Sequence, residues 1–418
     1  MITASIITIG DELLIGQVID TNSAWMAQQL NSIGIPVARR VAVGDNWDGI
    51  WNALDEESGK ANIIFITGGL GPTADDITKP LLCKYFDGEL IINQAALDNV
   101  THLFEHVFKR PITERNIKQA EVPNTCTVIL NKRGTASGMQ FKKNNTIYFS
   151  LPGVPFEMMG MMEDYILPFL SNQFQLPHIA HRTLVTFGIG ESMLADLIQD
   201  FETTLPNNIK LAYLPNHGIV RLRLTAIGPE KNEVNQLIDA LFADLKILVK
   251  DYLVTDEDEP MERKIGKMLL ERNQTISTAE SCTGGYIAHL ISSVPGSSAY
   301  YEGSLITYSY EAKEQLLAVK QSTLAQFGAV SEDVVKEMVN GLLTHTKTNY
   351  GIAVSGIMGP TGGMPDKPTG TVWMAVGNAE KIITQKFHFR FDRQKNIQLT
   401  AINALNLLRM FMLSIDKE

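Results

Sequence analysis

Residues 278–285 read Thr-Ala-Glu-Ser-Cys-Thr-Gly-Gly. The segment before them, 274–278, is short and β-branched, and the segment after them, 286–291, has the composition of a helix start. The stretch therefore predicts a tight turn between a strand and a helix. Such a turn lifts the Ser281 hydroxyl to the end of a sheet and leaves free N–H groups at the helix N-terminus, where an oxyanion or phosphate is stabilised. A helix cap with glycines for close packing would give the same pattern.

Later segments also place hydroxyls and glycines at strand ends. Residues 295–298 form a second hydroxyl-bearing turn, Pro-Gly-Ser-Ser. Residues 303–309 predict a strand that leads into a helix containing Lys313, and an apolar strand runs into the glycine-rich loop 355–363. Open α/β sheets bind their ligands at such strand ends, so these segments predict a shared site.

Five motifs follow one another in the last part of the chain: TAESCTGG, PGSSAYYEGSLITYSYEAK, FGAVSEDVV, SGIMGPTGG and KPTGTVW. Their order resembles the nicotinamide mononucleotide (NMN) deamidase domain of the CinA family. Because several long motifs match over about 160 residues, the resemblance is far more specific than a lone glycine loop.

The resemblance implies that this domain hydrolyses the carboxamide of NMN to nicotinate mononucleotide and ammonia, and that it needs no cofactor. It implies that five residues share one site: Ser281, Ser298, Tyr308, Lys313 and Ser355. It also implies substrate contacts from six residues: Thr283, Gly284, Gly285, Ser355, Gly356 and Arg393.

Amide hydrolysis needs a nucleophile, a base and donors for the oxyanion. The nearest histidine, His289, lies eight positions past Ser281, about 12 Å along a helix axis, so we do not expect a Ser-His pair. Lys313 is the remaining base, in a serine–lysine pair. A free lysine has a pKa of about 10.4, so it must be desolvated or lie beside positive charge, which the pyridinium of NMN would supply. A solvated lysine near a helix start is the alternative interpretation.

The roles within this site are open. We favour Ser281 as nucleophile because it lies on the sharper turn, and Ser298 is the rival nucleophile or an orienting group. Tyr308 could relay a proton or stack on the ring. Arg393 suits a phosphate clamp, although a solvated surface charge is as compatible with the pattern. Cys282 has no histidine partner in the sequence, so a buried small residue is expected there.

Length and composition set outer bounds. A chain of 418 residues suggests roughly two to four domains. The formal net charge of −10, from 36 basic and 46 acidic residues, counts against nucleic-acid binding. Three widely separated cysteines fit a reducing cytoplasm. The N-terminal stretch lacks the basic region of a signal peptide, and no run of about 18 apolar residues predicts a membrane span.

The N-terminal part alternates strands and helices. Strand 4–9 ends at a Gly-Asp-Glu turn, helix 23–33 follows, and strands 37–43 and 62–67 come next. The last of these runs into the glycine-rich segment 68–78. This alternation predicts an α/β fold with a doubly wound parallel sheet.

Two N-terminal motifs, GDELLIGQVIDTN and TGGLGPTADDIT, resemble the molybdopterin-binding-like fold of the CinA N-terminal domain. Glycines let backbone N–H groups approach a phosphate, and clustered acids suit a divalent cation such as Mg²⁺. The metal ligands expected are Asp11, Glu12, Asp75 and Asp76. The substrate contacts expected are Asn22, Gly68, Gly69, Gly71 and Thr73. Such a set suits a metal-bridged diphosphate attacked by water.

The resemblance implies ADP-ribose pyrophosphatase activity, giving AMP and ribose 5-phosphate. Alternatively, Asp75 or Asp76 merely caps the following helix. Within 131–138, Ser137 stands where the family usually has proline, so we expect a looser turn there.

Between these regions lies a small α+β module, with β-like segments 182–187 and 220–226 and helices near 193–201 and 233–249. The predicted domains are therefore 1–168 (molybdopterin-binding-like), 169–252 (α+β) and 253–418 (three-layer α/β/α deamidase). We expect a cytoplasmic homodimer acting on NMN and ADP-ribose, both products of NAD breakdown. Two rival hypotheses are a non-catalytic pterin- or nucleotide-binding N-terminal domain and an accessory role in DNA uptake or recombination.

Overall fold

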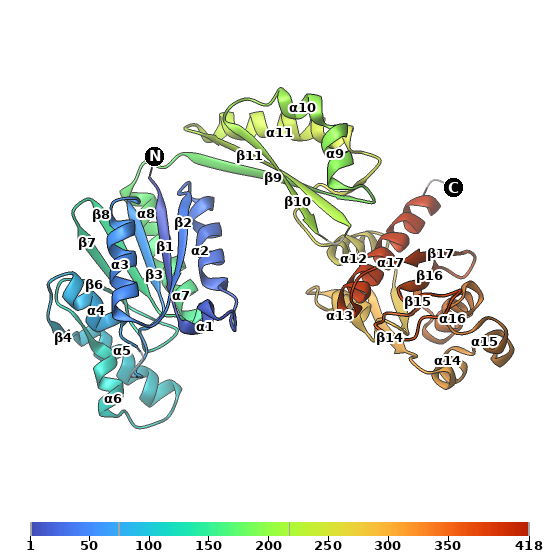
Figure 1. Cartoon of the computed structure of the whole chain (residues 1–418), viewed down its shortest axis with the longest axis horizontal. Coiled ribbons are helices and arrows are strands. Elements are labelled where there is room, and N and C mark those ends of the chain that lie inside the picture. Colours follow the sequence, from blue (N-terminus) through green and yellow to red (C-terminus); the bar gives the residue numbers. More distant parts are fainter. Residues whose placement is uncertain (1, 74–75, 217, 417–418) are drawn as a thin grey trace. The chain divides into compact units, whose positions relative to one another are not determined.

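A computed structural model of the chain describes residues 2–73, 76–216 and 218–416. Within these residues the longer strands form three separate sheets, of six, four and five strands in chain order (Figure 1). A further pair joins β4 (Leu90–Ile92) to β5 (Glu121–Pro123). Grouped by internal contacts, the chain forms two compact units, Met1–Ala180 with Thr225–Ile238, and His181–Leu224 with Asp239–Glu418.

The first sheet confirms the predicted parallel α/β arrangement. Its order is β2-β1-β3-β8-β7-β6, and the first four strands in that order are parallel. The pairs β8–β7 and β7–β6 are antiparallel, and a tight turn at Asn144, with φ of 56°, returns the chain directly from β7 into β8. The strands are β1 (Ala4–Ile9), β2 (Val37–Val43), β3 (Ile63–Thr67), β6 (Thr127–Ile129), β7 (Gly138–Lys143) and β8 (Thr146–Leu151).

Helices cover both faces of this sheet. In β1, Ile7 packs in one apolar cluster and Ile6 in the other, as expected for strands buried on both sides. The first cluster includes α3 (Trp47–Ser58) and α4 (Thr78–Tyr85), and the second includes α2 (Thr21–Ser32), α7 (Pro155–Met161) and α8 (Leu167–Gln173). The remaining helices of this region are α1 (Asp11–Leu14), α5 (Gln94–His102), η1 (Leu103–Val107), α6 (Glu114–Ile117), η2 (Lys118–Ala120) and η3 (Met162–Ile166).

The carboxyl ends of β1, β3 and β8 lie at one edge of the sheet, so the loops that follow them meet there. Gly68, directly after β3, has φ of 112°. A Cβ at this position would lie 2.3 Å from the carbonyl oxygen of Ile9. Only glycine therefore allows the loop after β3 to approach the end of β1 so closely.

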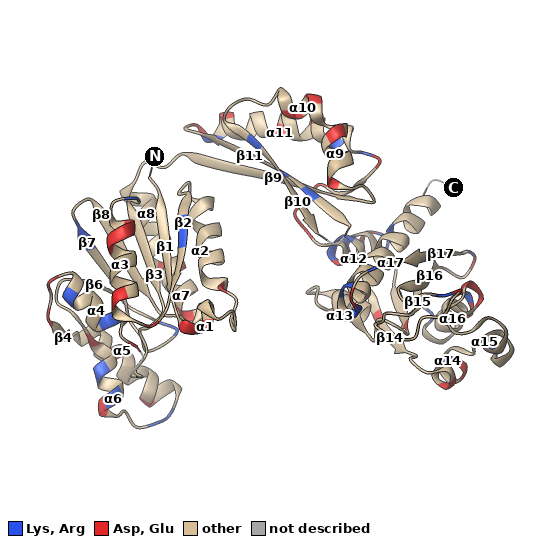
Figure 2. Cartoon of the chain, in the orientation of Figure 1, with Lys and Arg blue, Asp and Glu red and all other residues tan. Residues whose placement is uncertain are grey.

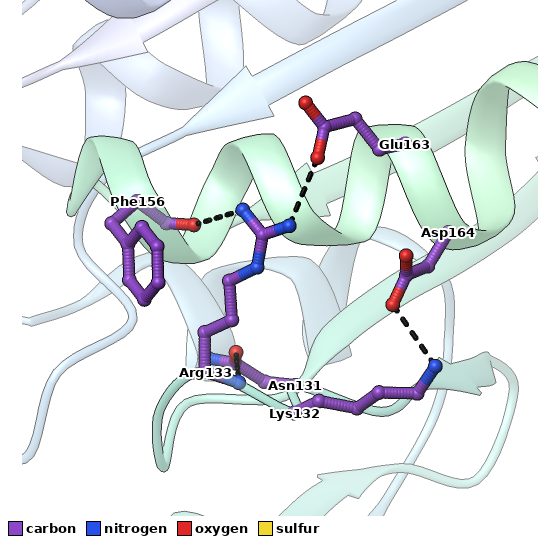
Figure 3. A network of polar contacts seen from close by, with 6 residues as sticks. All are labelled: Asn131, Lys132, Arg133, Phe156, Glu163 and Asp164. Atoms are coloured by element: carbon purple, nitrogen blue, oxygen red, sulfur yellow. Dashed lines mark hydrogen bonds and ion pairs between the residues drawn. The ribbon is translucent and has the colours of Figure 1, made fainter.

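Side chains hold the loop between β6 and β7, which contains Ser137, against the neighbouring helix (Figure 3). Arg133 donates to Glu163 at 2.9 Å, and Lys132 donates to Asp164 at 2.9 Å. Ser137 itself is buried. The looser turn expected from the missing proline stays a prediction, and these contacts are side-chain restraints on the same loop.

The second sheet has the order β10-β11-β9-β12. Strands and helices occur where 182–187, 220–226 and 233–249 predict them, but the helix predicted at 193–201 is two helices that meet at Ile198. The sequence does not predict β10, because Pro215 near its end argues against a strand. The elements are β9 (His178–Phe187), α9 (Glu191–Leu197), α10 (Gln199–Thr203), β10 (Ile209–Asn216), β11 (Ile219–Gly228), α11 (Lys231–Leu248) and β12 (Leu253–Thr255).

The third sheet has the order β14-β13-β15-β16-β17, with the first three strands parallel and the last two antiparallel. Its strands are β13 (Ile276–Glu280), β14 (Tyr301–Ile306), β15 (Tyr350–Gly356), β16 (Thr371–Gly377) and β17 (Ile382–His388). One face packs on α12 (Met261–Glu271), α13 (Tyr286–Ser292) and α17 (Arg393–Ile415), and the other on α14 (Tyr310–Leu317), α15 (Gln321–Phe327) and α16 (Glu332–Thr346). This is the predicted three-layer α/β/α arrangement.

Among the described residues, one helix, α17, is long and apolar enough to cross a membrane. Its most apolar window is 56% buried, and residues such as Leu405 and Phe411 belong to the core cluster beneath the sheet. Core packing therefore accounts for the apolar composition of α17.

Gly341→Ala should loosen the third sheet and its helices. A Cβ at this position of α16 would lie 1.8 Å from the carbonyl oxygen of Leu317, so α14 and α16 would have to separate at a cost of about 1–3 kcal/mol. We expect faster hydrogen exchange of β15 and β16 amides in the variant. Asn340→Ala, at the exposed neighbouring position, is the matched control and should not speed exchange. Equal exchange in Gly341→Ala and the parent protein would contradict this close approach.

Candidate active site

Two parallel strands of the third sheet bring a serine and a lysine together. β13 ends at Glu280, and the N–H of the next residue, Ser281, donates to the Val354 carbonyl of the adjacent strand at 3.1 Å. The neighbouring strand β14 leads into α14, which carries Lys313. Because parallel strands end at the same edge, both residues lie at the carboxyl edge of the sheet, as the sequence predicts.

Lys313 is fully buried and contacts three oxygen atoms. Its Nζ lies 2.8 Å from Ser281 Oγ, 2.7 Å from the Thr307 carbonyl oxygen and 3.4 Å from the Tyr308 carbonyl oxygen. Burial lowers the pKa of Lys313 from 10.5 to about 8, because the charged form loses hydration. The alternative of a solvated lysine is therefore wrong.

A cavity of about 180 Å³ opens beside this pair. It is lined by Ser281, Cys282, Tyr308, Lys313, Ala329, Val330, Ser355, Gly356, Met358 and Arg393. Four of the five residues that the resemblance groups together thus share one cavity. Ser355 Oγ donates to the Ala329 carbonyl at 2.8 Å, which ties the end of β15 to the loop before α16.

The rim of the cavity carries an exposed cation. Arg393 begins α17 and donates to the Gly359 carbonyl at 2.9 Å and to the Tyr308 hydroxyl at 3.2 Å. The side chains of both Arg393 and Tyr308 remain largely exposed. The guanidinium is therefore held in place by two neutral acceptors and still faces solvent, where it can meet an anion.

The N-terminus of α13 is not free, which corrects the expectation from the sequence. The Glu280 carboxylate is fully buried and accepts hydrogen bonds from the N–H groups of Gly285, Ile287 and Ala288, at 3.0, 3.1 and 2.7 Å. It also accepts from the Thr283 hydroxyl at 2.6 Å. Two residues expected to contact substrate, Thr283 and Gly285, thus contact a carboxylate of the chain itself. Gly284 lies on the same turn, with φ of 60°.

Ser298 lies away from this cavity. It belongs to the short helix η4 (Ser297–Ala299), is exposed, and precedes β14. The register pairs Ile276 with Tyr301, so Ser298 lies at the amino edge of the sheet, whereas Ser281 lies at the carboxyl edge. A strand of this length spans about 17 Å. Within one chain, the structure therefore does not bring Ser298 to the Ser281–Lys313 pair.

Asn396 is a residue that the sequence reading missed. It is fully buried in α17, donates to the Met358 and Phe391 carbonyls at 3.0 and 2.9 Å, and accepts from the Phe391 N–H at 3.2 Å. These bonds fix the glycine-rich loop and the chain just before Arg393 to the first turn of α17. Glu280 was missed as well, because its N–H partners lie five to eight residues later in the chain, whereas an ordinary N-cap side chain bonds to N–H groups two or three residues away.

The first sheet carries a second, smaller cavity of about 140 Å³ at its carboxyl edge, and Glu12, Asn22, Thr67 and Gly153 are among the residues that line it. Asn22 Nδ2 donates to the Gly153 carbonyl at 2.7 Å and to Thr67 Oγ1 at 3.3 Å. Its Oδ1 is buried and has no hydrogen-bond partner among the described residues.

Asp11 and Asp76 each bond to nearby backbone N–H groups. Asp11 Oδ1 accepts from the Asp45 N–H at 3.2 Å, and Asp76 accepts from the N–H groups of Gly71 and Thr73 at 2.8 and 2.9 Å. The described residues contain no group of three or more His, Cys, Asp or Glu side chains placed to hold a metal. The fourth expected ligand, Asp75, lies outside the described residues. Asp76 thus caps its own loop instead of the helix that follows.

The glycines of this loop permit tight backbone approaches. Gly69 has φ of 63°, and a Cβ there would lie 2.2 Å from Thr78 Oγ1. A Cβ on Gly71 would lie 2.5 Å from the Asp76 carboxylate. Glycine at these positions therefore serves the internal packing of the loop around Asp76 and Thr78.

Three family models match consecutive parts of the chain: the probable molybdopterin binding domain over 5–172, the damage-inducible protein CinA KH domain over 181–255, and the CinA C-terminal domain over 258–412. A CinA-like protein from Flavobacterium psychrophilum is 45% identical over 406 residues, which cover 97% of each chain. The chain belongs to the CinA family. A CinA-like protein from Cytophaga hutchinsonii is 44% identical over 98% of this chain and 97% of its own.

Among solved structures, the competence/damage inducible protein CihA from Agrobacterium tumefaciens is 34% identical to this chain. The comparison covers 36% of this chain and 92% of that chain, with a TM-score of 0.36. The expected family membership and fold class are thus confirmed by the family models and the two CinA-like relatives.

Cys282 should resist alkylation in the folded protein. Burial raises the pKa of its thiol to about 12, and the thiolate is the reactive form. We expect iodoacetamide at neutral pH to leave Cys282 unmodified, as measured by peptide mass spectrometry. The same protein unfolded in urea is the control and should be modified. Rapid labelling of Cys282 in the native protein would contradict its burial and reopen the case for a thiol nucleophile.

Proposed function

We propose that the C-terminal region hydrolyses the carboxamide of NMN through a serine–lysine pair. The observation that carries the proposal is the 2.8 Å contact between Lys313 Nζ and Ser281 Oγ, at a buried lysine beside a cavity. A nucleophile within hydrogen-bonding distance of a base is what acyl transfer requires. The motifs that resemble the NMN deamidase domain contain both residues.

In this mechanism the neutral amine of Lys313 accepts the hydroxyl proton while Ser281 Oγ attacks the carboxamide carbon. The two N–H groups of the neutral amine donate to the Thr307 and Tyr308 carbonyls, which leaves its lone pair for Ser281. The ammonium then returns the proton to the departing nitrogen, so ammonia leaves and an ester on Ser281 remains. Water attacks that ester with Lys313 again as base, and nicotinate mononucleotide is released.

The rim of the cavity suits the rest of the substrate. A pyridine ring placed in the cavity leaves the ribose phosphate outside, towards Arg393 and Tyr308. A guanidinium pairs well with phosphate oxygens. The positive charge of the pyridinium would further favour the neutral amine of Lys313.

The pH dependence should follow Lys313. Its lowered pKa means that the base form is reached above about 8 instead of 10.5, so kcat/KM for NMN should rise with pH and level off above about 8. Ser281→Ala and Lys313→Met should each lower kcat by about 10⁴-fold. Coupled assay of ammonia release across the pH range measures both effects.

Two variants serve as comparisons for that experiment. Ser298→Ala and Cys282→Ala should keep activity within about threefold, because neither side chain takes part in the proposed steps. A fully active Lys313→Met would remove lysine from the mechanism. Loss of turnover in Ser298→Ala with an active Ser281→Ala would assign the attack to the other serine.

For the N-terminal region we propose nucleotide diphosphate binding in the cavity beside Asn22, with ADP-ribose as the substrate. The buried Asn22 Oδ1, which has no partner among the described residues, supports it, since it offers a polar atom to a ligand in that cavity. The described carboxylates of Asp11, Glu12 and Asp76 do not fit a metal site. We therefore derive no hydrolytic step through a metal. The rival hypothesis, a non-catalytic nucleotide- or pterin-binding domain, predicts the same binding without hydrolysis.

ADP-ribose separates the two hypotheses. If the region is a hydrolase, AMP should appear by chromatography when Mg²⁺ is supplied and disappear with chelator. Asn22→Asp should weaken ADP-ribose binding by about tenfold, because it places a negative charge beside the diphosphate. The Ser281→Ala variant is the matched control and should release AMP at the unaltered rate. Binding without AMP release would establish the non-catalytic alternative.

An accessory role on DNA has less support. Acidic and basic segments are interspersed over the described helices and strands (Figure 2), and the chain is acidic overall. KH modules clamp a nucleic-acid backbone with a Gly-x-x-Gly loop. In 181–255 the glycines are at 188, 190, 218 and 228, so that spacing is missing. The cysteines are free thiols, which supports the proposed cytoplasmic location, and the homodimer stays a prediction.

A further inference from the structure

Glu280 is a buried carboxylate directly beside the candidate nucleophile, and none of the ion pairs found in the described part of the chain includes it. Its partners are neutral donors. They are the hydroxyls of Thr278 and Thr283, at 3.2 and 2.6 Å, and the N–H groups of Gly285, Ile287 and Ala288. These five neutral hydrogen-bond donors offset the free-energy cost of burying the carboxylate, so that no cationic partner is needed.

We infer that Glu280 is the positioning residue for Ser281, because it holds the turn after β13 to the start of α13. This inference deepens the proposed function and rests on it. The backbone of Glu280 belongs to β13, and its side chain reaches across the turn to α13. The turn that carries Ser281 is therefore fastened at both ends by the same residue.

Hydrogen bonds also link the backbone of Glu280 to Lys313, the proposed base. The N–H of Thr307 donates to the Glu280 carbonyl at 2.8 Å, and the carbonyl of Thr307 accepts from Lys313 Nζ at 2.7 Å. The positions of Ser281 and Lys313 are thus both set by the hydrogen-bonded backbone of Glu280 and Thr307. Gly284 and Gly285 permit the arrangement, because their φ values of 60° and 99° lie in the left-handed region that favours glycine, and the turn that they form brings the Gly285 N–H to Glu280.

A consequence follows for the substrate. A carboxylate already bonded to the first N–H groups of α13 repels a phosphate from that position. The exposed guanidinium of Arg393, which lines the cavity, is then the cation that a phosphate can meet.

The test is Glu280→Gln, which keeps the shape but turns N–H donors towards the N–H groups of α13. We expect kcat for NMN to fall about 100-fold, as for a displaced nucleophile, while KM stays within about threefold because Glu280 does not touch substrate. The acid limb of the pH profile should keep the position set by Lys313. Glu280→Asp should restore part of kcat, since it restores the charge.

Thr283→Val is a milder variant that tests the same inference if Glu280→Gln does not fold. It removes one donor to Glu280 and should lower kcat by about tenfold without changing KM. A rise in KM instead would show that Thr283 contacts substrate, and it would overturn the inference. Native kcat in folded Glu280→Gln, judged by an unchanged melting temperature, would overturn it equally.

A second readout separates this inference from the proposed function. The rate at which a fluorophosphonate probe labels Ser281 reports nucleophile geometry without NMN. Labelling that slows about 100-fold in Glu280→Gln supports the positioning role even if the parent protein does not deamidate NMN. Labelling at the parent rate contradicts it, whatever the substrate proves to be.

Discussion

The C-terminal region depends on one desolvated amine. Lys313 has lost its contact with water and keeps only Ser281 Oγ and two backbone carbonyls as close oxygen neighbours. An ammonium in such surroundings is disfavoured, and this single constraint gives the lysine the properties of a base. The strand order, the turn after β13 and the start of α14 can all be understood as the scaffold that keeps this amine away from solvent and next to a hydroxyl.

Much of this arrangement could be predicted from sequence. The Ser281 turn and the Lys313 helix each follow a strand in a parallel sheet, and strand order alone places them at one edge. Ser298 shows the limit of motif reading. It lies on a similar hydroxyl-bearing turn, but that turn precedes its strand, so the same topology sends it to the other edge. Whether a turn precedes or follows its strand decides at which edge of the sheet it lies, and its composition does not.

Side-chain direction was the part that the sequence could not supply. The motif indicates helix N–H groups after Ser281, yet only coordinates show that Glu280 already occupies them. In the first sheet, Asp76 likewise bonds to its own loop, where spacing alone suggested a metal ligand. Acids near glycine-rich loops either cap the loop itself or bind a ligand. The sequence pattern is the same in both cases, so it does not distinguish them.

The way Glu280 is held has a bearing on ionic strength. Dissolved ions screen exposed charges within about 10 Å at 0.1 M salt, but they reach buried hydrogen bonds poorly. The turn that carries Ser281 is secured by amide and hydroxyl donors in the interior, whereas the guanidinium of Arg393 is exposed at the surface. Salt would therefore weaken the binding of a phosphate-bearing ligand and leave the rate of the chemical step almost unchanged. Binding and chemistry would thus respond differently to the salt concentration.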